Sequence, residues 1–410
     1  MSRLAGKTIV LGVSGGIAAY KSAELVRLLV TAGASVRVMM TRNACEFITP
    51  LTMQTLSQNP VATDTFSLAE ESQIGHIRLA DQADAVIVAP ATANILAKAA
   101  AGIADDIVTT VLLATRAPVM FAPAMNVNMY AHPAVVENLA RLRARGVAIV
   151  EPGEGALACG WEGKGRLAEP AVIVEHLERI LAPGDLAGER ILVTAGPTQE
   201  AIDPVRFVSN RSSGKMGYAI ARAAWRRGAE VRLVSGPCAL AAPVGVERVN
   251  TVSAAEMLDA TSRNFPWCTA LVMAAAIADF RPARPAAHKV KKNEAGLALE
   301  MEGVPDEMPR IAAKKGERIL VGFAAETEDL ETNALDKLKR KRLDLIVAND
   351  VTQEGAGFSV DTNIVSLITA HGGAQRFPMM SKDEVADLIL DRVAAIRSEK
   401  ARSRKARAAR

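Results

Sequence analysis

The hydrophobic positions of the chain fall into two series of short apolar runs, and both series begin in the same way. Residues 7–41 contain an apolar run, a glycine turn, a segment with helical spacing, a glycine stop and a second apolar run. The same order returns at 189–196 and 214–236, with a longer loop between the first run and the helical segment. This alternation predicts that each half folds as strands and helices around an open parallel sheet.

Later apolar runs extend both predicted sheets. Near-continuous apolar strands are expected where helices cover both faces of a sheet. The runs in the two halves are 85–90, 118–122 and 147–152, then 270–276, 319–325 and 343–350. The predicted fold class is therefore α/β, with two doubly wound, mainly parallel-sheet (Rossmann-like) domains at residues 1–189 and 190–396. Pro and Gly in 181–190 mark the boundary.

Charge and cysteine content limit the kinds of partner and compartment that the sequence suggests. The net charge is +4, but the tail 397–410 carries seven Lys or Arg and one Glu, so the other residues sum to −2. We therefore expect no nucleic-acid face, and a disordered, solvated tail. The four Cys form no C-x-x-C pair, and the chain shows neither a signal-peptide pattern nor an apolar run of about 18 residues. A cytoplasmic protein without a membrane segment is expected.

The Gly- and Ser-rich loop "SNRSSGKMG" at 209–217 raises the question of a phosphate site. It is not the loop of nucleotide hydrolases, because Met216 stands where a magnesium-binding hydroxyl is required. Gly214 and the helix start after it still offer free N–H groups to an anion. The alternative is a plain helix entry with Ser caps.

The first loop, "GVSGGIAAYK" at 12–21, is short for a dinucleotide fingerprint. It lacks the third glycine, and Thr41 rather than an acidic residue ends the second apolar run. Ser14 and the N–H groups of Gly15 and Gly16 would suit the phosphate of a mononucleotide. A tight strand-to-helix turn explains the same residues equally well.

Five further side chains are candidates for chemistry. Thr92 and Asn94 follow a strand and could bind a ligand, although Thr92 could equally be a helix cap. Asn126 also follows a strand, and Cys159 lies in a glycine-rich segment typical of a mobile flap. His76 lies on a probable helix, where a surface or capping role is the alternative.

Four segments, "SGGIAAYK", "GHIRLAD", "PAMNVNMY" and "ACGWEGKGR", span most of residues 7–167. Together they resemble the flavin-dependent cysteine decarboxylases, and in particular the phosphopantothenoylcysteine decarboxylase half of the bacterial bifunctional enzymes of coenzyme A synthesis. The resemblance implies a flavodoxin-like flavoprotein domain that uses FMN. It implies His76 as a base, Asn126 as a substrate anchor and Cys159 as the proton donor of the last reduction. Tyr130 departs from the family, which usually has Trp there.

The second half resembles the phosphopantothenate–cysteine ligase half of the same enzymes over about 190–370, through the segments "TAGPTQEAIDPVRFVSNRSSGKMGYAIA", "AAAIADFRP", "KVKK", "GFAAET" and "LDLIVAND". The resemblance implies CTP as co-substrate, Mg²⁺ carried mostly by the triphosphate, and Asn210 and Lys289 as catalytic residues. A Lys-rich loop such as that of Lys289 is otherwise usually just solvated. The implied nucleotide contacts are Ala275, Asp279, Lys289, Pro305, Asp306, Phe323, Lys337 and Lys341. The choice of CTP over ATP rests on the resemblance alone, and no metal ligands are identified.

The predicted function is CTP-dependent ligation of cysteine to 4'-phosphopantothenate, followed by FMN-dependent decarboxylation of the product to 4'-phosphopantetheine. One alternative is a flavin decarboxylase whose second half only scaffolds. The other is a flavin-binding regulatory subunit, against which the presence of His76, Asn126 and Cys159 argues. The resemblance also implies a homo-oligomer, with trimeric flavin domains and dimeric ligase domains that could assemble into a dodecamer.

Overall fold

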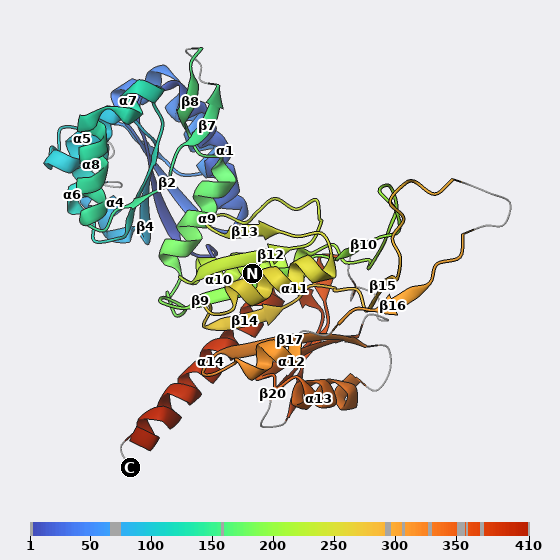
Figure 1. Cartoon of the computed structure of the whole chain (residues 1–410). Coiled ribbons are helices and arrows are strands. Elements are labelled where there is room, and N and C mark those ends of the chain that lie inside the picture. Colours follow the sequence, from blue (N-terminus) through green and yellow to red (C-terminus); the bar gives the residue numbers. More distant parts are fainter. Residues whose placement is uncertain are drawn as a thin grey trace. The chain divides into compact units, whose positions relative to one another are not determined.

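A computed structural model describes residues 3–65, 75–156, 160–291, 297–305, 308–326, 330–350, 357, 360–369 and 373–408. The chain divides into two compact units, Met1–Ala182 and Pro183–Arg410 (Figure 1). Each unit carries its own sheet and core. In the described ranges, no helix is both long and apolar enough to cross a membrane.

The sheet of the first unit is entirely parallel, with the order β3-β2-β1-β4-β5-β6. Its strands are β1 (Thr8–Val13), β2 (Ser35–Met40), β3 (Val61–Ala62), β4 (Ala85–Ala91), β5 (Val119–Pro123) and β6 (Ala148–Ile149). The predicted α/β class is confirmed. The order is that of the Rossmann sheet, whereas a flavodoxin sheet runs 2-1-3-4-5. The difference arises because β3 pairs outside β2, which leaves β1 beside β4.

Helices cover both faces of this sheet, so its strands are buried on both sides. One face packs against α1 (Lys21–Thr31), α2 (Pro50–Ser57) and α9 (Pro170–Leu181). The other packs against α4 (His76–Gln82), α5 (Ala93–Ala101), α6 (Ile107–Ala114) and α8 (Pro133–Ala144). The remaining elements are η1 (Ile17–Tyr20), η2 (Arg42–Glu46), α7 (Val127–Ala131) and the hairpin of β7 (Gly153–Ala156) and β8 (Glu162–Arg166).

The sheet of the second unit repeats this order and adds two strands. In the order β13-β12-β9-β14-β17-β18-β20-β21, the first six strands are parallel and the last two antiparallel. The strands are β9 (Arg190–Ala195), β12 (Glu230–Ser235), β13 (Glu247–Asn250), β14 (Ala270–Met273), β17 (Ile319–Glu326), β18 (Leu345–Asp350), β20 (Val365–Thr369) and β21 (Ala374–Arg376). In chain order the six parallel strands again read 3-2-1-4-5-6, so both units share one topology.

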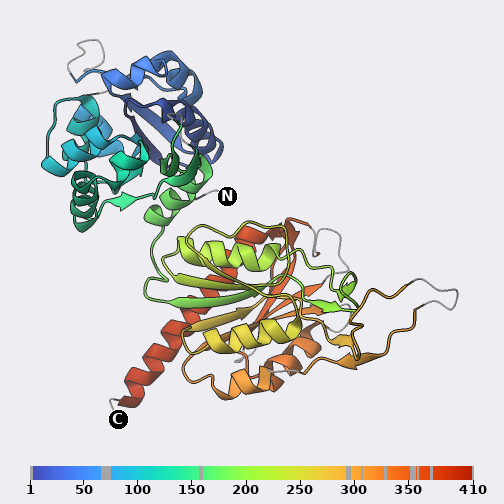
Figure 2. The ribbon, with the colours of Figure 1, turned by 45° about the horizontal axis from the view of Figure 1, so that its top comes forward.

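Two groups of helices enclose this second sheet (Figure 2). One face packs against α10 (Lys215–Arg226) and α14 (Lys382–Ala408), the other against α11 (Ala254–Asn264), α12 (Met308–Ala313) and α13 (Leu330–Arg340). Short pairs form around it: β10 (Gln199–Ala201) with β11 (Phe207–Ser209), β15 (Phe280–Pro282) with β16 (Met301–Gly303), and β19 (Thr362–Asn363) with β22 (Met380–Ser381). A Cβ on Gly217 would lie 2.5 Å from Ala195 Cβ, so glycine allows α10 to approach β9 closely.

The tail expected to be disordered is helical as far as Ala408, where α14 ends, which corrects that prediction. Its Ala, Arg, Lys and Glu residues are strong helix formers. Its base is also anchored, because Arg397 donates to Glu189 Oε2 at 2.7 Å and Lys400 donates to Arg318 O at 3.1 Å. The charge of the tail therefore says little about its order.

A buried guanidinium ties the start of the second unit to its last helix. Arg227 is 5% exposed and forms a bidentate pair with Asp185, which precedes β9. The same group donates to Asp387 O at 3.1 Å and lies 2.7 Å from Asp391 Oδ1 on α14. The segment before β9 is thus part of this unit's packing.

We expect Arg227→Met to lower the free energy of unfolding of the second unit by about 3 kcal/mol, because it leaves carboxylates without their cation. Urea unfolding followed by tryptophan fluorescence measures this change. The matched control is Arg263→Met, which removes the exposed pair with Asp259 and should cost less than about 1 kcal/mol. Equal losses in the two variants would contradict a special role for the Arg227 cluster.

Candidate active sites

In a doubly wound sheet, ligands bind at the carboxyl ends of the strands where the strand order reverses. In the first unit this point lies between β1 and β4. Ser14 follows β1 and donates to Pro90 O at 2.7 Å, while Thr92 N donates to Ser14 Oγ at 3.0 Å. Ser14 is 2% exposed, so its hydroxyl links the ends of β1 and β4 inside the protein.

A cavity of about 520 Å³ opens at this point. Its size suits a small molecule. Four of the predicted site residues line it together: Gly15, Gly16, Thr92 and Asn126. The β7–β8 hairpin contributes Ala156 and Arg166 to the wall and stands beside α7 (Figure 1). The structure thus gathers residues from four separate segments around one space.

The glycine loop permits an approach that no other residue allows. A Cβ on Gly15 would lie 2.4 Å from Asn43 Cβ, and one on Gly16 would touch Thr92 Cγ2 at 3.4 Å. Thr41 serves as the cap of η2, because its hydroxyl accepts from Ala44 N at 3.2 Å. Backbone, rather than side chains, therefore forms this wall of the cavity.

The hairpin is joined to the Asn126 segment by backbone contacts. Met125 N donates to Gly165 O at 3.0 Å, and a Cβ on Gly165 would lie 2.3 Å from Met125 O. Asn126 caps α7, with its Oδ1 accepting from Asn128 N at 2.8 Å. Asn126 is therefore held in a fixed orientation beneath the hairpin.

A charged cluster anchors the hairpin from the side. Glu151 accepts from the Tyr130 hydroxyl at 2.9 Å and from Lys164 at 2.6 Å, and it also pairs with Arg143. Burial acts to raise the pKa of Glu151, but the Lys164 and Tyr130 donors outweigh it and hold that pKa below its usual range. Burial and the neighbouring Glu151 raise the pKa of Tyr130 to about 12. Tyr130 thus supplies a hydrogen bond to this cluster.

Three predicted residues of the first unit lie elsewhere or cannot be placed. His76 is the first residue of α4 and does not line the cavity; its buried Nδ1 has no hydrogen-bond partner within the described ranges. Asn94 is exposed in the first turn of α5. Cys159 falls outside the described residues, between β7 and β8. The structure therefore does not bring these three into the cavity wall.

Two cations in the cavity wall were not predicted. Lys21, 8% exposed, pairs with Glu169 at 3.1 Å, and Arg166 pairs with the same carboxylate at 3.2 Å. A Lys in the first turn of a helix faces the positive end of the helix dipole, which is unfavourable without a nearby anion. The position of Lys21 at the start of a helix was the sequence feature that could have identified it.

In the second unit the order reverses between β9 and β14, and backbone pairing closes part of this edge. Pro197 bridges to Ala276, and Thr198 N donates to Ala276 O at 3.2 Å. Asn210 Nδ2 donates to Ala276 O at 3.1 Å and to Ile277 O at 3.2 Å. Asn210 and Ala275 are thus brought together at the strand tips.

The loop of 209–217 enters α10 through a left-handed residue. Gly214 caps the helix with a φ of 79°, which favours glycine. Its N–H donates to Ser212 Oγ at 3.3 Å, and Lys215 pairs with Asp361 at 2.7 Å. The start of α10 therefore stands at the same edge as Asn210.

The structure brings only some of the expected nucleotide contacts to the same edge of the sheet. Ala275 follows β14, Phe323 lies half-buried on β17, and Asp279 and Lys289 are exposed. Lys337 and Lys341 lie in and after the last turn of α13, which runs back from the carboxyl end of β17. Lys337 and Lys341 therefore lie toward the amino-terminal ends of the strands, whereas Ala275 lies at their carboxyl ends. Asp306 falls outside the described residues.

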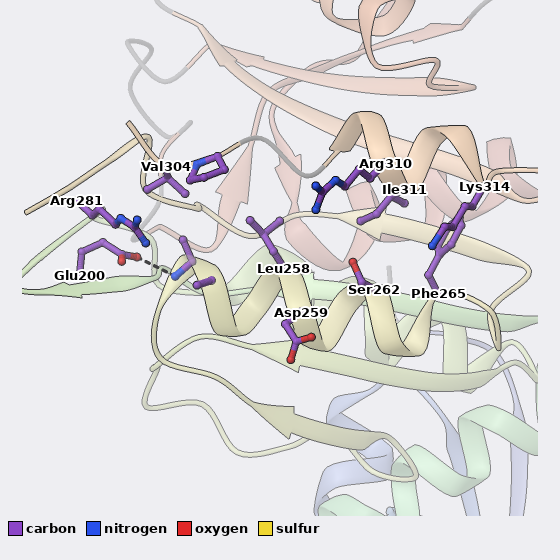
Figure 3. A pocket seen from close by; sticks show the side chains of 13 residues that line it. Glu200, Leu258, Asp259, Ser262, Phe265, Arg281, Val304, Arg310, Ile311 and Lys314 are labelled. Carbon is purple, nitrogen blue, oxygen red and sulfur yellow. Dashed lines mark hydrogen bonds between the residues drawn. The ribbon is translucent and has the colours of Figure 1, made fainter. Parts of the chain in front are cut away.

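The second unit has a cavity of about 450 Å³ between α11 and α12. Leu258 points from α11 toward α12, and Lys314, which directly follows α12, points toward Phe265 (Figure 3). Of the predicted residues only Pro305 lines it. The described part of the chain holds no group of three His, Cys, Asp or Glu side chains that could bind a metal.

Comparison with known proteins assigns both units. The family model described as "Flavoprotein" matches residues 2–182, and "DNA/pantothenate metabolism flavoprotein C-terminal domain" matches 186–396. The chain is 51% identical over 397 residues to the coenzyme A biosynthesis bifunctional protein CoaBC of Bacillus subtilis, covering 96% of this chain and 98% of that protein. It is 47% identical over 404 residues to the Escherichia coli K12 protein of the same name, covering 97% and 99%.

A crystal structure of the C-terminal domain of a CoaBC protein is 40% identical, covering 53% of this chain and 99% of that domain, with a TM-score of 0.46. The fold and the family models define a flavoprotein unit joined to a pantothenate-metabolism unit. The chain belongs to the family of coenzyme A biosynthesis bifunctional proteins, enzymes that combine phosphopantothenoylcysteine decarboxylase with phosphopantothenate–cysteine ligase.

We expect Tyr130→Phe to loosen the β7–β8 hairpin, because Glu151 loses one donor. A hydrogen bond to a charged group at this exposure contributes about 1 kcal/mol, so the amides of residues 162–166 should exchange about fivefold faster. Hydrogen exchange at pH 7 tests this, since Glu151 is ionised there and loses the interaction only in acid. Tyr20→Phe, which alters an exposed phenol, is the control and should leave exchange unchanged.

Proposed function

We propose that residues 1–189 form the FMN-dependent decarboxylase and residues 190–396 the CTP-dependent ligase of this bifunctional enzyme. The observation that supports this most directly is that each unit presents a glycine loop and an Asn at the switch point of its own sheet. In the first unit these are Gly15 and Asn126, and in the second Gly214 and Asn210. Two such edges on one chain suit two successive reactions on one substrate.

The cavity of the first unit fits a flavin mononucleotide. The backbone of Gly15 and Gly16 precedes a helix, which suits a phosphate, and the apolar side chains of Ile17 and Met129 line the wall. When bound, FMN supplies the two-electron oxidation of a thiol and the later return of those electrons. Thr92 completes the wall of the proposed cofactor site, and we propose that Ser14, Thr41 and Asn94, which do not line the cavity, contact the cofactor beyond it.

Protein groups hold the substrate and move its protons. Asn126 holds the carboxylate or amide of phosphopantothenoylcysteine under the hairpin. Cys159, on the hairpin connection, donates the proton of the last reduction, and a thiol has a suitable pKa for this. His76 acts as the base that starts thiol oxidation. Because His76 lies outside the cavity of its own chain, we assign it to the site of a second copy, in a homo-oligomer.

In the second unit the carboxylate of 4'-phosphopantothenate attacks the α-phosphorus of CTP, and pyrophosphate leaves. The amine of cysteine then attacks the acyl carbon, CMP leaves, and the amide forms. Asn210 orients the carboxylate, and Lys289 neutralises the charge that develops on the transferred phosphoryl group. Mg²⁺ enters with the triphosphate, which supplies most of its ligands. The proposed nucleotide contacts are Ala275, Asp279, Lys289, Pro305, Asp306 and Phe323. Lys337 and Lys341, which α13 carries toward the opposite edge of the sheet, are not part of this proposed set.

One experiment separates this function from its alternatives. The purified chain should show a flavin spectrum, should form CMP from CTP with phosphopantothenate and cysteine, and should release carbon dioxide from the product. Carbon dioxide release without CMP formation would leave a decarboxylase with a scaffolding second half. A flavin spectrum with neither reaction would leave the regulatory subunit.

We expect Gly15→Ala to weaken FMN binding about tenfold or more. The new Cβ would lie 2.4 Å from Asn43 Cβ, so the loop must shift, and such overpacking costs about 1–3 kcal/mol. Fluorescence titration of the apoprotein with FMN measures the change. The control is Gly153→Ala, whose new Cβ would meet only Arg166 O at 3.9 Å. Unaltered FMN affinity in Gly15→Ala would place the cofactor elsewhere.

We expect Asn210→Asp to lower kcat/KM for ligation about 100-fold. The new carboxylate faces two backbone carbonyls and the substrate carboxylate, a loss of about 3 kcal/mol. Steady-state CMP release measures it. The control is Asn264→Asp, in which Arg232 faces the new carboxylate and ligation should be unchanged. Normal kinetics in Asn210→Asp would exclude Asn210 from the site.

A further inference from the structure

The turn between β10 and β11 contains a carboxylate that is fully buried and fully bonded. The side chain of Asp203 has no exposed surface. Its Oδ1 accepts from Val205 N at 2.8 Å and Arg206 N at 2.9 Å, and its Oδ2 accepts from Arg206 Nε at 3.0 Å. These bonds alone would make Asp203 a local staple of the hairpin turn.

The same pair also reaches a distant segment of the chain. Asp203 Oδ2 accepts from Val290 N at 3.1 Å, and the Arg206 guanidinium donates to Val290 O at 2.5 Å. Both backbone polar groups of Val290 are therefore held by one ion pair, 87 and 84 residues earlier in the chain. Ala286 N adds a bond to Ile202 O at 2.9 Å, so the whole segment 286–290 follows the turn.

The residue before Val290 is Lys289, whose side chain is exposed. The opposite end of the hairpin leads into Asn210, which is fixed to Ala276 and Ile277 at the strand tips. Ser209 Oγ also donates to Thr198 O at 2.8 Å. One short hairpin thus connects the two residues assigned to the ligase reaction, although they are far apart in sequence.

We propose that Asp203 is a positioning residue, which holds Lys289 in register with Asn210 through the β10–β11 hairpin. This rests on the proposed roles of Lys289 and Asn210. A buried carboxylate whose two oxygens both accept hydrogen bonds is held rigidly. A misplacement of about 1 Å at a reacting group costs about 100-fold in rate. Asp203 touches no substrate in this scheme and acts only through Lys289.

The test is Asp203→Asn in the full chain, since asparagine keeps the size but removes the charge and one acceptor. We expect kcat for CTP-dependent ligation to fall about 100-fold, with KM for phosphopantothenate within about threefold. Trypsin should cut faster after Lys289 and Lys291. Carbon dioxide release from added phosphopantothenoylcysteine by the first unit of the same molecules should be unchanged and serves as the concentration standard, while urea unfolding followed by tryptophan fluorescence shows that the second unit is folded.

The matched control is Glu302→Gln, which breaks the ion pair with Arg281 between β15 and β16 and should alter neither reading. If Asp203→Asn does not fold, Arg206→Lys keeps the charge but loses the two-nitrogen donation to Asp203 and the bond to Val290 O, and it should show the same changes to a smaller degree. Unchanged kcat, or unchanged cleavage after Lys289, in the folded variant overturns the inference. Absence of ligation in the unaltered chain would instead refute the proposed function.

Discussion

The reversal of strand order between two neighbouring parallel strands is the constraint on which both units depend. Chain leaving β1 turns toward one side of the sheet and chain leaving β4 toward the other, so no connection covers the gap between their ends. The gap must be lined by whatever follows each strand. In both units those residues are glycine, small hydroxyl side chains and an amide, because only short groups fit between two strand tips.

The two units use this common edge differently. In the first, the edge stays open as a cavity under the β7–β8 hairpin, an arrangement that can surround a ring system and exclude water. In the second, pairing of Pro197 with Ala276 closes part of the equivalent edge, and Asn210 bonds to the backbone there. A surface of that kind suits two charged molecules that must meet end to end. The same topology is therefore compatible with both of the proposed reactions.

The parallel strands were predictable because burial on both faces demands continuous apolar runs, as in β4 and β17. The hairpins β10–β11 and β15–β16 were not, since each strand has only three residues, most of them exposed or half-buried. The gathering of Gly15, Thr92 and Asn126 followed from their positions after parallel strands. The separation of Lys337 from Ala275 did not, because motif matching ignores the direction of a helix. Asp203 could not be singled out from the sequence, because its bond from Val290 arises only in the fold.

The pairs Arg227–Asp185 and Arg397–Glu189 determine what a self-sufficient fragment of the second unit must contain. A cut at residue 190, where the apolar pattern begins, would discard both acidic partners while leaving the two arginines in place. Removing the basic terminus after residue 396 would take away the cationic partner of Glu189 and leave it with its bond from Thr269. An autonomous fragment should therefore start at Pro183 and retain the chain through Lys400, so that the ion pairs between its two ends can form.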